Sequence, residues 1–169
     1  MQLNLPAYLS CCFTGPRPEK LPWNYNERDS RCLILKNKIK DTIAAVYNSG
    51  IRHFICGMAK GCDMYFAEAV ITLRDELPGI TLEAAIPCDT QSSAWSPKQK
   101  ARYDYIVHQC DIETILQHEY TRDCMLLRNM YMVNNSSLLI AVYGGTGGGT
   151  LHTINYAIKQ GIRVIQLKP

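Results

Sequence analysis

The sequence predicts an α/β fold, a Rossmann-like three-layer sandwich in which a mostly parallel sheet carries helices on both faces. Short apolar runs alternate with longer segments of helical periodicity along the whole chain. The apolar runs are nearly continuous, which is typical of strands that are buried on both faces. A length of 169 residues suits one domain, which we expect to span residues 1–169.

The first half of the chain contains three apolar runs that are separated by two helical patterns. Residues 8–13 form the first expected strand, and a polar loop leads to a helix over 30–49. Apolar residues recur in that helix at i, i+4, i+8 and i+11, and a glycine ends it. A strand over 52–56 precedes a helix over 63–77, and a third strand follows over 81–86.

The second half continues the alternation. Ser96 and Pro97 are typical of a helix N-terminus, with a capping hydroxyl before a proline in the first turn. The remaining elements are strands over 112–116, 138–143 and 163–167 and helices over 123–134 and 150–160. In open sheets of this kind, ligands bind beyond the carboxyl ends of the strands. The loops after the first, second and fifth strands are therefore the candidate binding segments.

Composition excludes several classes of protein. A hydrophobic fraction of 47% and a charged fraction of 20% are typical of a soluble globular protein. No apolar stretch reaches the roughly 18–20 residues that span a bilayer, and the first ten residues lack the features of a secretion signal. We therefore expect a cytoplasmic location and no membrane partner. The net charge of +3 is small and the basic residues form no dense run, so nucleic acid is not an expected partner.

The eight cysteines contain no CxxC pair, and several lie in apolar runs where a free thiol packs as a small hydrophobe. We expect reduced thiols and no metal site. The alternative is that Cys12, Cys56 and Cys88, which lie near strand ends, converge on a metal ion.

The segment Gly144–Thr150 contains five glycines in seven residues, between a strongly apolar strand and a helix. Glycines let the backbone approach a ligand closely, and successive N–H groups at a helix N-terminus attract an anion. A flexible turn is the alternative interpretation, although glycines in such number weaken folding. The candidate phosphate-binding residues of this loop are Gly145, Gly147, Gly148, Gly149 and Thr150.

Two other loops repeat the strand–loop–helix design. In the segment 57–63, Lys60 is a candidate for pairing with a phosphate, and Asp63 is either a helix cap or a ligand contact. In the first loop, Arg17 lies between two prolines and is a candidate for a preorganised phosphate contact. The other candidates in these loops are Thr14, Gly15, Gly57 and Gly61.

Taken together, these motifs resemble the SLOG superfamily, which includes the DNA-processing protein DprA and the LOG cytokinin-activating enzymes. Residues 12–18 (CFTGPRP) followed by 21–27 (LPWNYNE) are similar to the opening signature of its YpsA-like branch, usually TGHRP with LPWxYNE. Pro16 replaces the usual histidine and removes a polar contact. The similarity continues through the two later glycine loops and Arg128-Asn129, and covers essentially the whole chain.

The resemblance implies a small nucleotide-binding or nucleotide-derivative-binding protein with a sensor or regulatory role, and some relatives are linked to bacterial cell division. It adds Arg128 and Asn129 to the candidate site, and suggests that Trp23 or Trp95 stacks a base or ring. No cofactor is certain, but a nucleotide, ADP-ribose or an NAD-like molecule is the implied small phosphate-bearing ligand. A homodimer or a regulatory protein partner is also implied.

Two alternative functions come from the neighbouring branches. LOG enzymes cleave nucleoside monophosphates with the Arg of MxxRK and the Glu of GGxGTxxE. Arg128 is similar to the first of these residues, but Thr153 stands at the position of the second, so a nucleotide N-glycosidase would need Asp63 or Glu27 as its carboxylate. The other alternative is a DprA-like binder of single-stranded nucleic acid.

Overall fold

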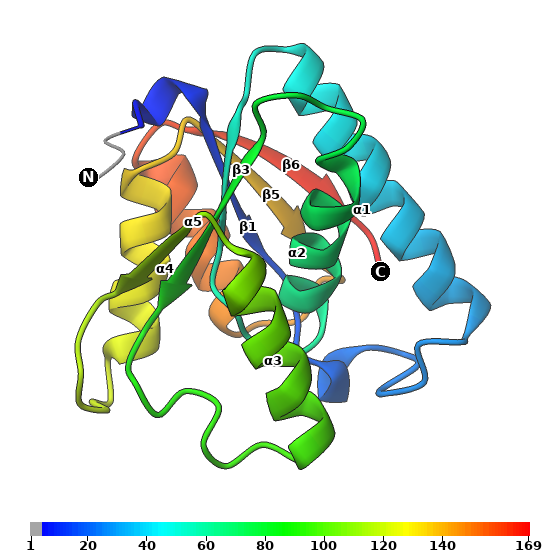
Figure 1. The fold of residues 1–169 in the computed structure, drawn as a ribbon, viewed down its shortest axis with the longest axis vertical. Coiled ribbons are helices and arrows are strands. Elements are labelled where there is room, and N and C mark those ends of the chain that lie inside the picture. The colour runs from blue at the N-terminus through cyan, green and yellow to red at the C-terminus, as the bar shows by residue number, and fades with distance from the viewer. Residues whose placement is uncertain (1–4) are drawn as a thin grey trace.

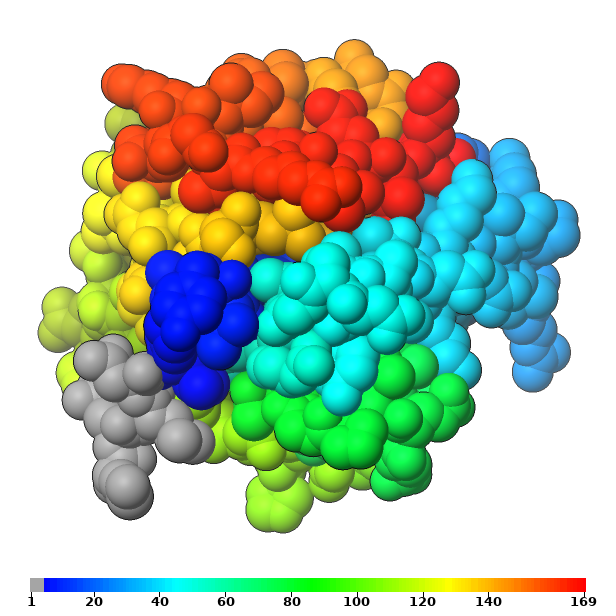
Figure 2. Space-filling view, turned by 90° about the horizontal axis from the view of Figure 1, so that it is seen from above, coloured from blue at the N-terminus to red at the C-terminus, as the bar shows by residue number. Residues whose placement is uncertain are grey.

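In residues 5–169, six strands form one parallel sheet, as the sequence predicts, and their order is β4-β3-β2-β1-β5-β6 (Figure 1). The structure is a computed structural model that describes residues 5–169. The strands are β1 (Ser10–Thr14), β2 (His53–Cys56), β3 (Thr81–Ile86), β4 (Ile112–Ile115), β5 (Leu138–Val142) and β6 (Arg163–Leu167). Seen from one end of the molecule, the red, gold, blue and green segments succeed one another in bands across the surface (Figure 2).

Five helices cover the two faces of the sheet and complete the three predicted layers (Figure 1). The helices are α1 (Ser30–Asn48), α2 (Cys62–Leu73), α3 (Pro97–Gln109), α4 (Cys124–Asn134) and α5 (Gly149–Lys159). Helices α1, α2 and α3 lie on one face, and α4 and α5 lie on the other. Two short 3-10 turns, η1 (Ala7–Leu9) and η2 (Pro18–Lys20), flank β1. Within residues 5–169, no helix combines the length and the apolar character that a bilayer crossing demands.

The alternation of side chains along each strand divides the core between the two faces. In β1, Cys11 and Phe13 pack with the residues of α1 and α2, whereas Cys12 packs with those of α4 and α5. The ring of Phe13 stacks on Phe66 of α2, with 4.5 Å between the ring centroids. These thiols therefore fill the core as small apolar groups.

A buried polar network fixes α4 on the sheet. The carboxylate of Glu83 accepts hydrogen bonds from the Tyr131 hydroxyl of α4 (2.7 Å) and the Thr114 hydroxyl (2.8 Å), and lies 2.7 Å from His53 Nε2. The other ring nitrogen of His53 lies 2.8 Å from the Thr81 hydroxyl. Because each buried polar group has a partner, the network holds α4 in one position without leaving an unsatisfied charge.

The strand order creates a switch point beside β1. The chain builds β1 to β4 outward in one direction, and then crosses to β5 on the other side of β1. The connections on the two sides run over opposite faces of the sheet, so the carboxyl ends of β1 and β5 are left with an open crevice.

Candidate functional site

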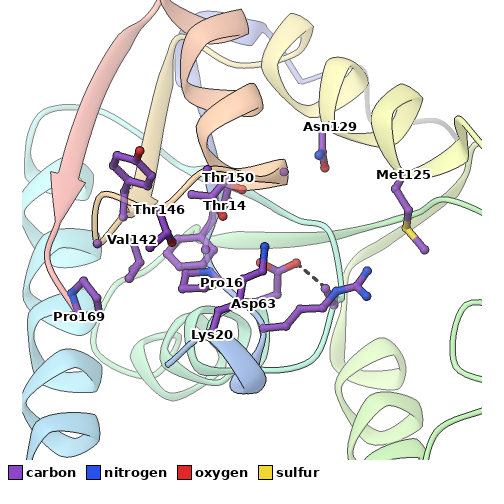
Figure 3. A pocket seen from close by; sticks show the side chains of 18 of the residues that line it. Thr14, Pro16, Lys20, Asp63, Met125, Asn129, Val142, Thr146, Thr150 and Pro169 are labelled. Carbon is purple, nitrogen blue, oxygen red and sulfur yellow. Dashed lines mark hydrogen bonds between the residues drawn. The ribbon is translucent and has the colours of Figure 1, made fainter. Parts of the chain in front are cut away.

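A cleft of about 410 Å³ opens at the carboxyl ends of β1 and β5, at the switch point (Figure 3). Its walls come from the loop after β1, the segment before α2, helix α4 and the glycine loop before α5. Segments that are far apart in the sequence thus meet at one place. The predicted residues that line the cleft are Thr14, Gly15, Arg17, Asp63, Arg128, Asn129, Gly147, Gly149 and Thr150.

The N-terminus of α5 faces this cleft without a capping side chain. Its N-cap residue is Gly148, with φ of +125°, a backbone conformation that residues other than glycine rarely adopt. The first N–H groups of the helix therefore have no protein acceptor among the described residues. A Cβ at Gly147 or Gly149 would meet nothing within 4 Å, so open space surrounds the loop.

Lys20, at the end of η2, reaches the same point from the opposite wall. Its Nζ would lie 2.7 Å from a Cβ placed on Gly148, so its ammonium group lies beside the helix N-terminus. Within residues 5–169, no carboxylate forms an ion pair with Lys20. A cation and a helix N-terminus repel one another unless an anion lies between them, and this arrangement therefore suits an anionic ligand.

Among the Asp and Glu side chains of residues 5–169, only that of Asp63 lines the cleft, against the cations Arg17, Lys20 and Arg128. Its side chain is buried, and Oδ2 accepts a hydrogen bond from the Ala59 N–H at 3.0 Å. Burial raises the pKa of Asp63 to about 6, although the charges of Arg128 and Arg17 and the Ala59 hydrogen bond act in the opposite direction. Asp63 serves as a buried acceptor at the cleft rather than as the N-cap of α2, because Gly61 occupies the N-cap position.

Arg128 lies against the floor of the cleft and is 5% exposed. Its guanidinium donates to the Gly57 carbonyl and, through Nε, to Asn129 Oδ1 at 2.7 Å. Gln91 Nε2 donates to the same Gly57 carbonyl at 3.0 Å. Burial lowers the pKa of Arg128, while the charge of Asp63 raises it. Arg128 is thus a structural cation that joins α4 to the loop after β2, as well as a residue that lines the cleft.

The glycines of the second loop contact protein atoms rather than open space. A Cβ at Gly57 would lie 2.5 Å from the Arg128 guanidinium, and one at Gly61 would lie 2.9 Å from the Pro16 carbonyl oxygen. Gly61 also has φ of +85°. Neither glycine lines the cleft, and both allow the first two loops and α4 to pack closely. Their contact with a ligand stays a prediction.

Lys60 also lies outside the cleft lining. Its Nζ donates to the Tyr25 hydroxyl at 3.0 Å and lies 3.6 Å from Glu19, and the Tyr25 hydrogen bond is the main cause of its raised pKa. Lys60 is therefore engaged outside this cleft, and its pairing with a phosphate stays a prediction. In the glycine loop before α5, Gly145 and Gly148 also lie outside the lining of the cleft. Gly148 nevertheless determines the backbone path of this loop through its positive φ.

Neither tryptophan is placed to stack on a ligand in the cleft. Trp23 is 4% exposed in the core, where its indole N–H donates to Tyr65 at 3.4 Å. Trp95 packs edge-on against Tyr103, with 5.3 Å between the ring centroids. Neither position supports stacking in this cleft, and the stacking role stays a prediction. The apolar residues that line the cleft are ones that the sequence did not indicate. These residues are Phe13, Met125, Met132 and Val142.

Of the three positions that matter for a glycosidase, Glu27 and Thr153 lie away from the cleft. The Glu27 carboxylate accepts hydrogen bonds from Arg102 and from Lys36 Nζ (2.7 Å). Burial alone would raise the pKa of Glu27, but these hydrogen bonds lower it. Thr153 is buried, and its hydroxyl donates to the Gly149 carbonyl at 2.9 Å. Of the two candidate carboxylates, the structure brings only Asp63 to the cleft.

The fold is similar to that of solved DNA-processing proteins A. The structure from Streptococcus pneumoniae superposes with a TM-score of 0.65 at 16% sequence identity, over 94% of this chain. The structure from Helicobacter pylori superposes with a TM-score of 0.61 at 15% identity, over 95% of this chain. This chain spans 50% and 65% of the length of those two proteins. The Helicobacter pylori structure concerns a mode of single-stranded DNA binding. The small net charge led us to expect no nucleic-acid partner. That expectation is wrong, because a protein with this fold binds single-stranded DNA.

Sequence relatives identify the family. The chain is 31% identical to the SPbeta prophage-derived protein YoqJ of Bacillus subtilis strain 168 in an alignment of 139 residues, and the alignment covers 72% of this chain and 81% of that protein. It is 24% identical to YpsA of the same strain over 132 residues, which are 77% of this chain and 73% of that protein. The profile of the YspA SLOG family matches residues 11–163. The resemblance seen in the sequence is confirmed, and the chain belongs to the YspA SLOG family.

Proposed function

We propose that the cleft binds a nucleotide and holds its phosphate between Lys20 and the N-terminus of α5. The observation that carries this proposal is the Lys20 ammonium beside Gly148, the N-cap of a helix whose first N–H groups lack a protein acceptor among the described residues. A phosphate at this point would accept from both and would separate the two positive groups. Arg17, at the exposed rim of the same wall, would add a second cation.

The remainder of the cleft fits the nucleoside portion. Its volume of about 410 Å³ lies within the range of small-molecule sites, roughly 300–1,000 Å³. Met125, which is partly exposed, supplies apolar surface for a base or sugar, whereas Phe13 and Met132 lie behind the cleft wall in the core. Asp63 presents a buried acceptor whose Oδ1 has no donor among the described residues, which suits a sugar hydroxyl or a base amino group.

The proposed role is binding without turnover. Thr153, at the position where the LOG glutamate stands, uses its hydroxyl within α5 and does not line the cleft. Asp63 is the remaining carboxylate there, and glycosidic cleavage ordinarily relies on a pair of carboxylates that flank the scissile bond. A sensor or regulator requires only that the ligand stabilise one state of the protein.

Single-stranded DNA is a second candidate, favoured by the DNA binding of the Helicobacter pylori protein and by the exposed position of Arg17 and Lys20 at the rim. A strand offers the same phosphate chemistry, and one nucleotide unit would occupy the cleft while its neighbours follow the rim. Because each neutralised phosphate releases counterions, the affinity of a strand would fall steeply with salt.

A thermal-shift comparison of AMP, adenosine, inorganic phosphate and oligothymidylate tests the proposal. At about a hundredfold excess over the dissociation constant, AMP should raise the melting temperature by about 5–10 °C, because it binds only the folded state. Adenosine, which lacks the phosphate, should have little effect. A shift with oligothymidylate alone would favour the second candidate. No shift with any phosphate compound would refute both.

A further inference from the structure

A second hollow, of about 670 Å³, lies between α3 and the strand β4 at one edge of the sheet. It shares no lining residue with the nucleotide cleft. Its walls come from the loop after β3, one side of α3, and the side chains of Glu113 and Ile115 on β4. We call it the β4 groove.

The β4 groove carries uncompensated negative charge. Four carboxylates line it, against Lys100 as the one ammonium group. Two of the four have partners: Asp111 binds Arg74 at 2.6 Å, and Asp89 lies 3.0 Å from His118. The other two, Asp104 of α3 and Glu113 of β4, form no ion pair or hydrogen bond through their side chains to any residue in 5–169. Unpaired carboxylates from two facing walls favour a cation between them.

A hydroxyl of a buried residue in the same groove also lacks a partner. Ser92 lines the groove and is 7% exposed, yet its hydroxyl makes no hydrogen bond within the described part of the chain. Neighbouring hydroxyls do find partners, since Ser93 donates to the Thr90 carbonyl at 2.9 Å. The buried atoms that lack a partner in residues 5–169 belong to Arg74, Gln99 and Ser136, so the Ser92 hydroxyl is accessible from the groove and can bond to a ligand there.

The strand beside the groove has a free edge. β4 pairs with β3 in parallel, from Ile112 opposite Glu83 to Ile115 opposite Ile86, and no other strand in residues 5–169 pairs with it. Its outer N–H and C=O groups are therefore open to another extended chain. Ile115 is an exposed large apolar side chain at this edge, which offers apolar contact to such a chain.

The arrangement of the carboxylates favours basic side chains over a single metal ion as the cation. Among the described residues, no three His, Cys, Asp or Glu side chains are placed to hold one metal ion. The negative charges are instead distributed along a groove that runs beside a strand edge. Basic side chains on an extended chain match this distribution, because alternate residues of a strand point to the same face.

We propose that the β4 groove binds an extended segment of a partner protein, which adds to β4 as a strand and places Lys or Arg side chains at alternate positions near Asp104 and Glu113. Main-chain hydrogen bonds to β4 would give affinity, and the carboxylates with Ser92 would give preference for basic residues. Burial raises the pKa of Tyr103, and the nearby carboxylates of Glu113 and Asp104 raise it further.

The test uses the whole chain and a labelled synthetic peptide in which lysine alternates with valine and threonine, followed by fluorescence anisotropy. The peptide should bind, and Asp104→Asn and Glu113→Gln should each weaken binding about fivefold, the upper range for an exposed ion pair. Asp41→Asn on the exposed side of α1 is the matched control and should leave the affinity unchanged. Circular dichroism verifies that each variant folds.

Three further probes separate the proposed occupant from others. The same peptide with N-methylated backbone amides should bind at least tenfold more weakly, because strand pairing is blocked. The peptide with glutamate in place of lysine should not bind. If spermine displaces the peptide and the N-methylated peptide binds equally well, the groove is a site for small cations and the strand proposal is wrong. Absence of binding at millimolar peptide would also overturn it.

Discussion

Asp63 makes the stability of the protein depend on pH in a direction opposite to that of most carboxylates. Burial raises its pKa from the ordinary 3.8 to about 6. Between these two values the folded protein binds more protons than the unfolded chain, so the free energy of unfolding falls as the pH rises. The contribution is fully present below about pH 4 and is lost above about pH 6. Since one pKa unit corresponds to about 1.4 kcal/mol, the total change is about 3 kcal/mol.

Asp63→Asn isolates this effect, because an amide does not titrate and its oxygen can still accept the Ala59 N–H. Near pH 4 the variant and the parent should be about equally stable, since the carboxyl is then neutral. At pH 7 the variant should be more stable by about 3 kcal/mol. Urea unfolding, followed by far-ultraviolet circular dichroism at several pH values, measures both curves. Asp41→Asn, at an exposed position of α1, controls for the loss of one charge. Parallel curves for the parent and Asp63→Asn would refute the reasoning.

Three other outcomes follow from the cleft. Arg128→Ala should lower the free energy of unfolding by about 3–5 kcal/mol, measured in urea titrations. The substitution removes a buried cation that binds the Gly57 carbonyl and compensates a buried carboxylate. A loss below about 1 kcal/mol would contradict the structural role. Gly148→Val should weaken AMP binding at least tenfold in calorimetry with the circular dichroism spectrum unchanged, because φ of +125° disfavours valine and its Cβ would meet Lys20. AMP incubated with the protein should yield no free adenine by chromatography, because Thr153 supplies no carboxylate; adenine release that Asp63→Asn abolishes would show a glycosidase.

Local patterns are sufficient to predict most of the fold. The bounds of β3 and β6 agree with the predicted 81–86 and 163–167, and Ser96 caps α3 by accepting from the Gln99 N–H at 3.3 Å. The predicted start of β1 is less accurate. The strand begins at Ser10 rather than at residue 8, because the ladder with β2 begins where Ser10 lies opposite His53. Such a limit depends on the partner strand and has no signal in the segment itself.

The candidate site is predictable in outline but not in detail. The strand–loop–helix pattern places the first and last loops at one edge, because the carboxyl ends of parallel strands share it, and the structure brings both loops to the cleft. Lys60 and Trp23 lie outside the cleft because tertiary partners, Tyr25 and Tyr65, hold these side chains elsewhere. The position of Lys20 beside the N-terminus of α5 could not be predicted, because it depends on how η2 packs against α5 and no local sequence pattern encodes that packing.

The central claim is that Lys20 and the N-terminus of α5 hold the phosphate of a nucleotide, and calorimetric titration of AMP into paired variants tests it most directly. Lys20→Ala removes the cation beside Gly148, whereas Lys159→Ala removes an exposed cation from the opposite end of the same helix. Loss of a charge-assisted hydrogen bond, about 1.5–3 kcal/mol, predicts that Lys20→Ala weakens AMP binding by about tenfold to a hundredfold. Lys159→Ala should bind AMP as the parent does. Equal affinities for AMP in all three proteins, or equal losses in both variants, would contradict the account.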